Sequence, residues 1–166
     1  MGPRDLTAAY SCPDCGTGPA LDHGRPGYRL RPVPAGLGLS LSRSHGWALL
    51  AAGPARPAGA AEPSVGVDLE HSSGVIFPGF DDVALTPAER QRLSTLAPEQ
   101  VTLWRTAAWA RKEALLKARG TGLRVEPASV EAYAEPGAGT MLVDLDTDAL
   151  GLPPGFAGAL AVIDAA

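Results

Sequence analysis

The pattern of apolar and polar positions divides the chain into a first part of loops and short strands and a mixed second part. Residues 1–27 are rich in Gly, Pro and polar residues, which predicts loop. Residues 28–41 predict a few short extended pieces, and the uncharged run 47–52 predicts a buried strand that ends at Gly53. The Ala-, Pro- and Gly-rich stretch 53–63 then predicts a linker or long turn.

The second part begins with a strand and continues into a helix. In residues 64–70, Val and Leu alternate with Gly, Asp and Glu, which is the period of a strand with two different faces. Thr86, Pro87 and Glu89 form a helix-start pattern, with an N-cap, a proline in the first turn and a capping box. We expect this helix to run to about Leu96.

A second, longer helix is predicted over residues 99–118, because Gly120 and Gly122 follow it as stop signals. Short strands are predicted at residues 129–134, 141–145 and 156–163. A strand, then helices, then further strands indicate an α+β fold rather than a parallel βαβ array.

Composition narrows the class of partner. The net charge is −4, from 14 Lys and Arg against 18 Asp and Glu, and this disfavours nucleic acid as the main partner. No apolar run approaches the roughly 20 residues that span a bilayer, and the N-terminus lacks the apolar core of a signal peptide. We therefore expect a cytoplasmic protein that binds neither nucleic acid nor membrane.

Three carboxylates and a lysine are candidates for chemistry. Asp68 and Glu70 stand two apart in a predicted strand, so both project to the same side. Trp109, Glu113 and Lys117 stand four apart in a predicted helix and share one face. Carboxylates held close repel one another unless a cation lies between them, and Mg²⁺ takes a few carboxylates together with water and phosphate oxygens. Taken alone, without the combination of segments, these carboxylates and the lysine are more simply interpreted as solvated surface charges.

The combination of segments resembles the paired signature of the 4′-phosphopantetheinyl transferase superfamily. Residues 65–70, VGVDLE, resemble the family motif (V/I)G(V/I)D(I/L/V)E. Residues 109–117, WARKEALLK, resemble WxxKE(A/S)xxK, and GTGL at 120–123 resembles the GxGL that follows it. Upstream, residues 24–26 resemble G(K/R)P, and SLSRSHGW at 40–47 resembles SLSHSGGW.

The resemblance covers roughly residues 12–133 and has three departures. Arg43 stands where the family has a histidine, and His45 replaces a glycine. Arg43 can bind a phosphate in a bidentate manner but cannot act as a neutral base. Only about two dozen residues precede Arg25, whereas Sfp-like members carry a longer segment with basic residues. We therefore expect weak discrimination between coenzyme A and dephospho-coenzyme A.

The resemblance also implies a fold. It implies two pseudo-symmetric α+β halves with small antiparallel sheets and coenzyme A in the cleft between them. Residues 1–60 are expected to form an abbreviated N-terminal half with loops that bind the phosphates. Residues 61–166 are expected to form the C-terminal half with the metal site.

The implied activity is transfer of 4′-phosphopantetheine from coenzyme A to a serine of an acyl, polyketide or peptidyl carrier protein, with release of 3′,5′-ADP. The resemblance implies Mg²⁺, or Mn²⁺ in its place, held by Asp68, Glu70 and Glu113. Glu113 and Lys117 are the implied catalytic residues. The residues implied to contact coenzyme A are Arg25, Ser42, Arg43, His45, Lys112 and Lys117.

Two alternatives stay open on the sequence alone. A relative that binds coenzyme A or carrier proteins without turnover would account for the short front and for Arg43. A small zinc module would use Cys12 and Cys15, which form a CxxC, together with His23. A structural zinc site usually needs four ligands, so a tight turn with two reduced thiols is the simpler interpretation of this CxxC.

Overall fold

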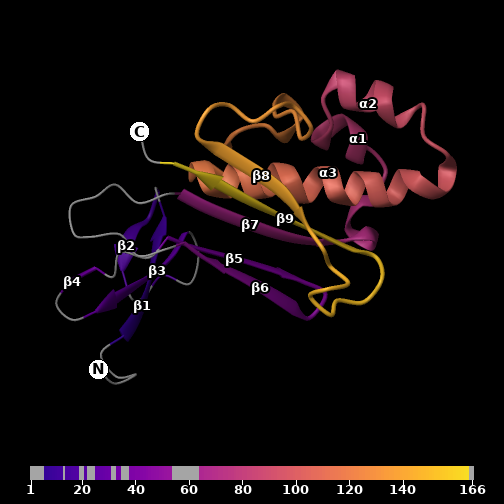
Figure 1. The fold of residues 1–166 in the computed structure, drawn as a ribbon. Helices are drawn as coiled ribbons and strands as arrows, with labels where there is room; N and C mark the ends of the chain where they lie inside the picture. Colours follow the sequence, from indigo (N-terminus) through magenta and orange to yellow (C-terminus); the bar gives the residue numbers. More distant parts are fainter. Residues whose placement is uncertain are drawn as a thin grey trace.

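Three antiparallel sheets and one long helix make up the described part of the chain (Figure 1). The computed structural model describes residues 6–12, 14–18, 21, 25–30, 33–34, 38–53 and 64–164. Within these residues every helix follows His71, so the first part consists of strands and the second part is mixed. The predicted α+β class with small antiparallel sheets is confirmed.

The first sheet has four short strands in the order β2-β1-β3-β4. They are β1 (Leu6–Cys12), β2 (Gly16–Gly18), β3 (Arg25–Leu30) and β4 (Val33–Pro34). The prediction of loop over residues 1–27 is therefore wrong for β1, β2 and the start of β3. The reason is non-local pairing: β1 pairs with β3, and Leu6 lies opposite Leu30, which no local composition reveals.

The second sheet is a hairpin of β5 (Leu39–Ser44) and β6 (Trp47–Ala52). His45 and Gly46 both have positive φ, 47° and 81°, which the two-residue turn of such a hairpin requires. The predicted strand at β6 is confirmed, but its predicted burial is wrong, since Trp47 is 42% and Leu50 is 56% exposed. Among the described residues only β5 pairs with β6, which leaves this apolar strand at an edge.

The third sheet carries the long helix. Its order is β7-β9-β8, with β7 (Ser64–His71), β8 (Thr140–Leu145) and β9 (Phe156–Ile163), and α3 (Pro98–Arg119) crosses it. A Cβ on Gly66 would lie 2.0 Å from the carbonyl oxygen of Ala114 and 2.4 Å from the amide nitrogen of Ala118. Backbone therefore meets backbone where α3 crosses β7, and this contact places the helix over Asp68 and Glu70.

Short helices connect β7 to α3 and α3 to β8. They are η2 (Ser72–Val75), α1 (Phe80–Ala84), α2 (Pro87–Leu93), η3 (Gly122–Arg124) and η4 (Pro127–Ser129). The predicted capping box is confirmed: Thr86 Oγ1 accepts from the Glu89 amide at 3.1 Å, and the Glu89 carboxylate accepts from the Thr86 amide at 2.9 Å. Helix α2 ends at Leu93, earlier than expected, while α3 ends at a left-handed Gly120 as predicted.

The predicted strand at 129–134 is wrong. This segment holds the end of η4 and irregular backbone, and the amide of Ala132 donates to Glu89 Oε1 at 2.7 Å. A backbone group that is satisfied by a buried side chain is not available to a neighbouring strand. The strands predicted at 141–145 and 156–163 are confirmed as β8 and β9.

Two apolar clusters hold α3 in place. The first lies between α3 and the third sheet and is built largely from alanines, namely Ala110, Ala114, Ala118, Ala159 and Ala161. Small side chains allow the helix to approach the sheet closely. The second lies between α3, α1 and α2 and includes Val75, Phe80, Leu85, Leu93 and Ala108. None of the described helices is both long and apolar enough to span a bilayer.

Candidate functional site

Asp68 and Lys117 meet where β7 passes under α3. Lys117 Nζ donates to Asp68 Oδ1 at 2.6 Å and to the carbonyl oxygen of Val67 at 3.3 Å. From the β5 strand, Ser42 Oγ also donates to Asp68 Oδ1, at 2.8 Å. The structure thus joins residues 65–70 to residues 109–117, the two segments that carry the family resemblance. It also brings Ser42, from the third segment at residues 40–47, to the same carboxylate.

Asp68 is the buried centre of this arrangement. Its side chain is only 3% exposed, against 28% for Lys117. Both hydrogen bonds reach Oδ1, while Oδ2 is buried and has no hydrogen-bond partner. A buried carboxylate oxygen without a partner is costly, so this atom is poised to accept a further donor or a cation.

Glu70 and Glu113 complete an acidic group around Asp68. Burial raises the pKa of Glu70 to about 7, and the negative charges of Asp68 and Glu113 add to the rise, while Lys117 and a hydrogen bond from Trp109 oppose it. Burial is also the main cause that raises the pKa of Glu113, followed by the charge of Asp68, with Lys117 acting in the opposite direction. The three carboxylates therefore destabilise one another when all are ionised.

The donor set fits a divalent cation in its chemistry. Oxygen ligands from carboxylates are what Mg²⁺ prefers, and the unpartnered Asp68 Oδ2 offers one. In the described part of the chain, however, no three His, Cys, Asp or Glu side chains stand close enough together to hold a metal ion. The carboxylates of Asp68, Glu70 and Glu113 are close enough to repel one another electrostatically. Lys117 supplies the positive charge at Asp68.

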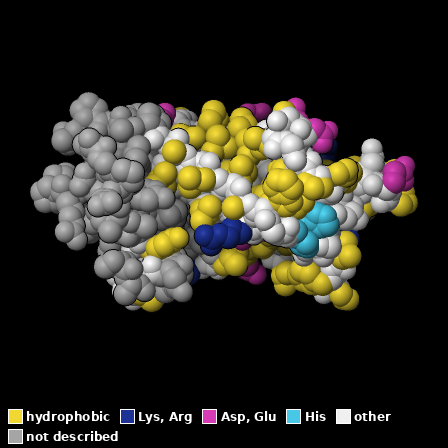
Figure 2. Space-filling model, turned by 90° about the horizontal axis from the view of Figure 1, so that it is seen from below, with side chains coloured by type: hydrophobic (Ala, Val, Ile, Leu, Met, Phe, Trp, Pro, Cys, Tyr) yellow, Lys and Arg dark blue, Asp and Glu magenta, His cyan; other side chains and the backbone are white. Residues whose placement is uncertain are grey.

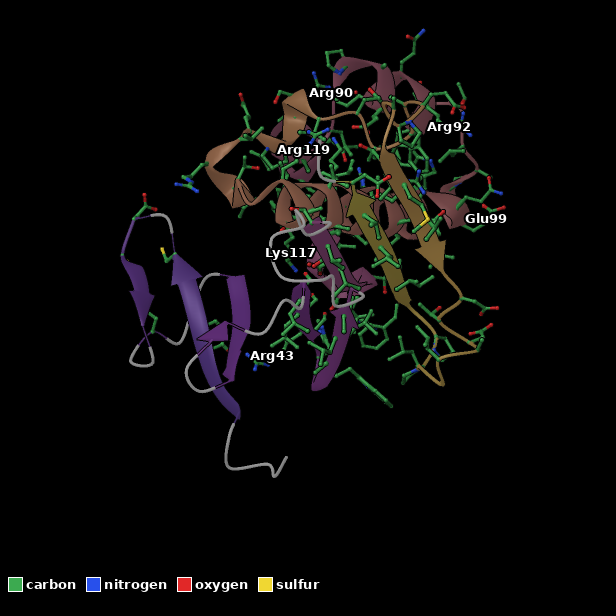
Figure 3. All side chains as sticks on the ribbon, turned by 60° about the vertical axis from the view of Figure 1, so that its left-hand side comes forward. Arg43, Arg90, Arg92, Glu99, Lys117 and Arg119 are labelled. Atoms are coloured by element: carbon green, nitrogen blue, oxygen red, sulfur yellow. The ribbon has the colours of Figure 1, made fainter. Side chains whose placement is uncertain are left out.

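Arg43 follows Ser42 on β5 and is exposed. Figure 3 shows Arg43 and Lys117 toward the same side of the molecule, with Arg92 of α2 at the opposite side. Successive side chains of a strand point to opposite faces, so Arg43 projects from the face of β5 opposite to the one on which Ser42 meets Asp68. The expected phosphate contact of Arg43 stays a prediction.

His45 lies at the β5–β6 turn in a group with His71 and Ser73. Ser73 Oγ is 2.8 Å from His45 Nε2 and 2.9 Å from His71 Nδ1, and the two rings lie 4.4 Å apart. Figure 2 shows histidine side chains gathered in one patch on a face with few charged groups. His45 therefore contacts a histidine and a serine here, and its expected contact with coenzyme A stays a prediction.

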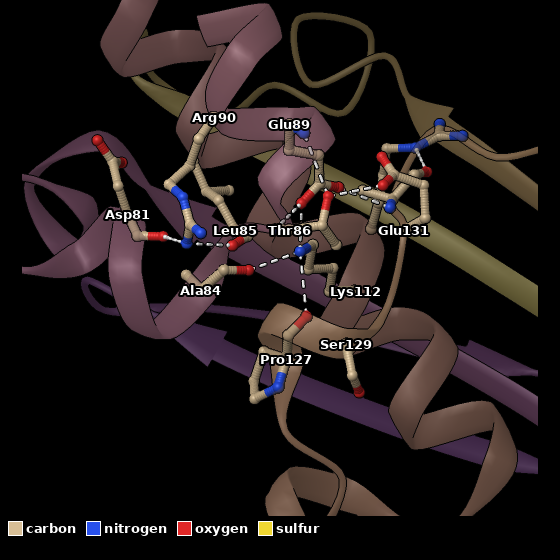
Figure 4. Close-up of polar contacts among 12 residues, drawn as sticks. Asp81, Ala84, Leu85, Thr86, Glu89, Arg90, Lys112, Pro127, Ser129 and Glu131 are labelled. Carbon is tan, nitrogen blue, oxygen red and sulfur yellow. Dashed lines mark hydrogen bonds and ion pairs between the residues drawn. The ribbon is translucent and has the colours of Figure 1, made fainter.

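The structure does not bring Lys112 to the carboxylate site. Its ammonium is fully buried and binds Glu89, the carbonyl oxygen of Ala84 and the carbonyl oxygen of Pro127 (Figure 4). Lys112 and Glu113 are consecutive on α3, so they point about 100° apart around the helix. This placement contradicts the expected phosphate contact of Lys112. All three N–H groups of its ammonium donate to acceptors in the protein interior.

The remaining expected residues lie in the first sheet. Arg25 begins β3, and its side chain lies outside the described part of the structure. Cys12 and Cys15 form no disulfide, and the hydrogen bond between their side chains is the largest cause that raises the pKa of Cys15. His23, the third group of the zinc alternative, lies outside the described residues.

Two residues at the site and one that binds Lys112 have roles that the sequence patterns do not indicate. Ser40 Oγ accepts from the Val67 amide at 2.9 Å and so fixes β5 beside β7. Trp109 opposes the rise in the pKa of Glu70, whereas its position four residues before Glu113 indicates only a shared helix face. Glu89 binds Lys112. The sequence pattern at Glu89 predicts only the capping box at the start of α2 and not this ion pair.

Residues 64–151 match the family model of the 4′-phosphopantetheinyl transferase superfamily. This segment holds β7, α3 and therefore Asp68, Glu70, Glu113 and Lys117. It spans more than half of the chain, and it is the part in which the predicted signature residues are gathered. No curated protein matches the chain.

Solved structures resemble the fold. A holo-(acyl-carrier-protein) synthase from Bacillus anthracis str. Ames has a TM-score of 0.50 at 21% identity, and the match covers 62% of this chain and 96% of that one. A holo-[acyl-carrier-protein] synthase from Thermotoga maritima has a TM-score of 0.46 at 22% identity over 62% of this chain and 64% of that one. The ACPS–CoA complex of Chronobacterium ammoniagenes has a TM-score of 0.44 at 22% identity over 64% and 99%. With both signature segments meeting at Asp68 and Lys117 and the family model matching the residues that carry them, this chain belongs to the 4′-phosphopantetheinyl transferase superfamily.

Proposed function

We propose that the protein transfers 4′-phosphopantetheine from coenzyme A to a serine of a carrier protein domain and releases 3′,5′-ADP. Membership of the family supports the transferase class. The Bacillus anthracis neighbour is described as a complex with CoA (3′,5′-ADP), which supports coenzyme A as the donor. The observation that carries the proposal is the contact of Asp68 with Lys117, because it assembles both signature segments into one site.

The reaction needs a nucleophile, a proton acceptor and charge stabilisation. The serine oxygen of the carrier attacks the β-phosphorus of coenzyme A, the phosphorus that bears pantetheine, and the bond to 3′,5′-ADP breaks. Glu113 accepts the serine proton, and its raised pKa makes this carboxylate a better base. Lys117 stabilises the departing phosphate, since most of the catalysis of phosphoryl transfer comes from positioning and charge.

Asp68, Glu70 and Glu113 are the residues that would hold Mg²⁺, or Mn²⁺ in its place. Bound there, the cation would neutralise the negative charge of the pyrophosphate. The unpartnered Oδ2 of Asp68 and the raised pKa of Glu70 support this assignment. We assign coenzyme A contacts to Ser42, Arg43 and Lys117, with Arg25 and His45 as further candidates.

The division into halves is part of the proposal. Residues 1–60 would form the N-terminal half that contributes β5 with Ser42 and Arg43, and residues 61–166 would form the half that carries the carboxylates. The contact of Ser42 with Asp68 then crosses between the halves. We further propose that the protein acts in the cytoplasm on acyl, polyketide or peptidyl carrier domains.

Incubation with coenzyme A and Mg²⁺ should add one phosphopantetheine to an apo carrier domain. Intact mass would show the gain on the carrier, and chromatography would show 3′,5′-ADP in equal amount. A carrier with its modified serine changed to alanine is the matched control and should gain nothing. If no carrier domain of the same genome is modified while a reference transferase modifies them, the enzyme assignment fails and a binding protein without turnover is favoured.

Arg43→Ala should raise KM for coenzyme A about tenfold and leave thermal stability nearly unchanged. A charge-assisted hydrogen bond to a phosphate contributes roughly 1.5–3 kcal/mol, and 1.4 kcal/mol corresponds to a factor of ten. Because Arg43 is exposed, its loss leaves no buried cavity. Arg92→Ala, an exposed arginine on α2, is the matched control and should leave KM unchanged. An unchanged KM in Arg43→Ala would remove this residue from the coenzyme A site.

A further inference from the structure

Lys112 and Glu89 form an ion pair inside the protein, on a different face of α3 from Glu113. The exposed fraction is 0% for Lys112 and 1% for Glu89. Lys112 Nζ donates to Glu89 Oε2, to the carbonyl oxygen of Ala84 at 2.5 Å and to that of Pro127 at 3.1 Å. One ammonium group therefore ties α3 to the end of α1, to α2 and to η4 (Figure 4).

Glu89 is equally saturated. Its Oε2 accepts from the Thr86 amide at 2.9 Å as well as from Lys112, and its Oε1 accepts from the Ala132 amide at 2.7 Å. The carboxylate therefore does three tasks: it closes the capping box of α2, it pairs with the lysine and it holds the irregular segment after η4. Every polar atom of this pair has a defined partner, which gives the pair a single geometry.

Such a pair is a poor source of stability by itself. Both charges are removed from water, and the desolvation cost of such a pair can exceed the attraction between its two charges. Replacing a buried ion pair by apolar groups of similar volume is often neutral or stabilising. A role for this pair must therefore be sought in what its fixed geometry does to the rest of α3.

The neighbour of Lys112 on α3 is Glu113. Consecutive residues differ by about 100° around a helix, so a helix that is held at Lys112 has a fixed direction for Glu113. Lys117, one turn after Glu113 on the same helix face, binds Asp68. A rotation of α3 by a fraction of a turn would separate Glu113 from Asp68 and Glu70 together.

We propose that the buried Lys112–Glu89 pair is a positioning device, which fixes the rotation of α3 so that Glu113 faces Asp68 and Glu70. The inference rests on the proposed function, because it assigns the pair to the same carboxylate site. Lys112 and Glu89 act here only through Glu113 and contact no substrate. The pair thus orients a residue of the carboxylate site from a position outside that site.

The test separates positioning from stability with a double variant. Glu89→Gln alone leaves a buried lysine charge without its partner, and Lys112→Met alone leaves the carboxylate charge, so each should lower Tm strongly. The double variant removes both charges and should regain part of the lost Tm, because Glu89→Gln keeps one acceptor for the amides of Thr86 and Ala132 and the carbonyl oxygen of Ala84 loses its donor. Its Mn²⁺ affinity, measured by electron paramagnetic resonance with coenzyme A present, should stay about 10- to 100-fold weaker, as for other residues that orient metal ligands. Its kcat should fall by a similar factor, with less change in KM for coenzyme A.

Arg105→Met is the matched control. Arg105 lies two turns before Lys112 on the same helix face and ties α3 to Asp81 of α1. Its loss should leave Mn²⁺ affinity and kcat unchanged. If it weakens Mn²⁺ binding as much as the double variant does, any link to α3 has the same effect and the specific role of the pair is overturned.

Recovery of Mn²⁺ affinity and kcat together with Tm in the double variant would also overturn the proposal, since the pair would then be only structural. Should the double variant fail to fold, Glu89→Asp keeps both charges but shortens the carboxylate, and it should weaken Mn²⁺ binding severalfold with a small change in Tm. Wild-type affinity in Glu89→Asp would contradict the proposal. A wild-type protein that binds no Mn²⁺ and modifies no carrier overturns the proposed function, and this inference with it.

Discussion

Glu113→Gln is expected to lower kcat about 100-fold or more while the protein becomes no less stable. The substitution keeps the shape of the side chain and removes the charge that the proposed base and metal ligand needs, and loss of one such contact commonly costs 10²- to 10³-fold. Intact-mass kinetics at saturating coenzyme A and carrier would measure kcat, and circular dichroism would measure Tm.

The expected stability follows from the sign of the pKa shift. Burial and the charge of Asp68 raise the pKa of Glu113, so its ionised form is less favourable in the folded protein than in the unfolded chain. Near neutral pH this charge therefore destabilises the fold, and a neutral glutamine removes the effect. Activity and stability should move in opposite directions, which a simple folding defect cannot produce.

Glu99→Gln is the matched control for this substitution. Glu99 is an exposed carboxylate in the first turn of the same helix, and it lies far from Lys117 in Figure 3. Its change should leave kcat near wild type and cost only a few tenths of a kcal/mol from the lost interaction with the helix dipole. A Glu113→Gln variant that runs within a few-fold of wild type would remove Glu113 from both proposed roles.

Features that form within a few residues could be predicted from the sequence. The start of α2 is one, because Thr86 and Glu89 complete their two hydrogen bonds within a single turn. The side on which Asp68 and Lys117 project is another, because it follows from the periods of strand and helix. That these two side chains meet could be expected only from the resemblance to a family, since neither period says which strand lies under which helix.

The expectation that Lys112 contacts a phosphate follows the family motif and disregards the helix period, which indicates a buried position. Ala108 and Leu116 stand one turn before and one turn after it, and both are fully buried. The helix period therefore puts this lysine on the apolar face of α3, while Glu113 and Lys117 share another face. The cation reaches the interior because Glu89 supplies a partner from another helix, and that pairing is not visible in α3 itself.

The remaining differences come from non-local contacts. The strands before residue 27 form because β1 pairs with β2 across the turn that follows Cys12 and with β3 along its other edge. The expected strand near Ala132 is absent because Glu89, far away in sequence, takes its amide hydrogen. Burial of β6 was predicted from its apolar composition, yet within the described residues only one strand pairs with it. Each of these three outcomes depends on which strand or side chain lies close enough to pair, and local composition does not indicate that partner.

Gly66→Ala should lower the free energy of unfolding by about 3 kcal/mol or more and should also lower kcat. The added Cβ would lie 2.0 Å from the Ala114 carbonyl oxygen and 2.4 Å from the Ala118 amide nitrogen, and both are backbone atoms that no side-chain rotation can remove. Helix α3 must then shift away from β7. Overpacking of a core costs about 1–3 kcal/mol and more where the backbone moves, and at this chain length 1 kcal/mol lowers Tm by about 2–4 °C.

Activity should fall beyond what unfolding explains, because a shift of about 1 Å between Asp68 and Lys117 can cost on the order of 100-fold in rate. Gly158→Ala is the matched control: Gly158 lies opposite Leu69 in the neighbouring strand, and its added Cβ would meet Leu145 at an ordinary 3.4 Å. Both substitutions put an alanine into the same sheet, but only Gly66→Ala pushes against α3. Urea denaturation and kcat of the folded fraction would compare them. Equal stability and activity of the two variants would show that α3 does not depend on backbone contact at Gly66 to hold Lys117 over Asp68.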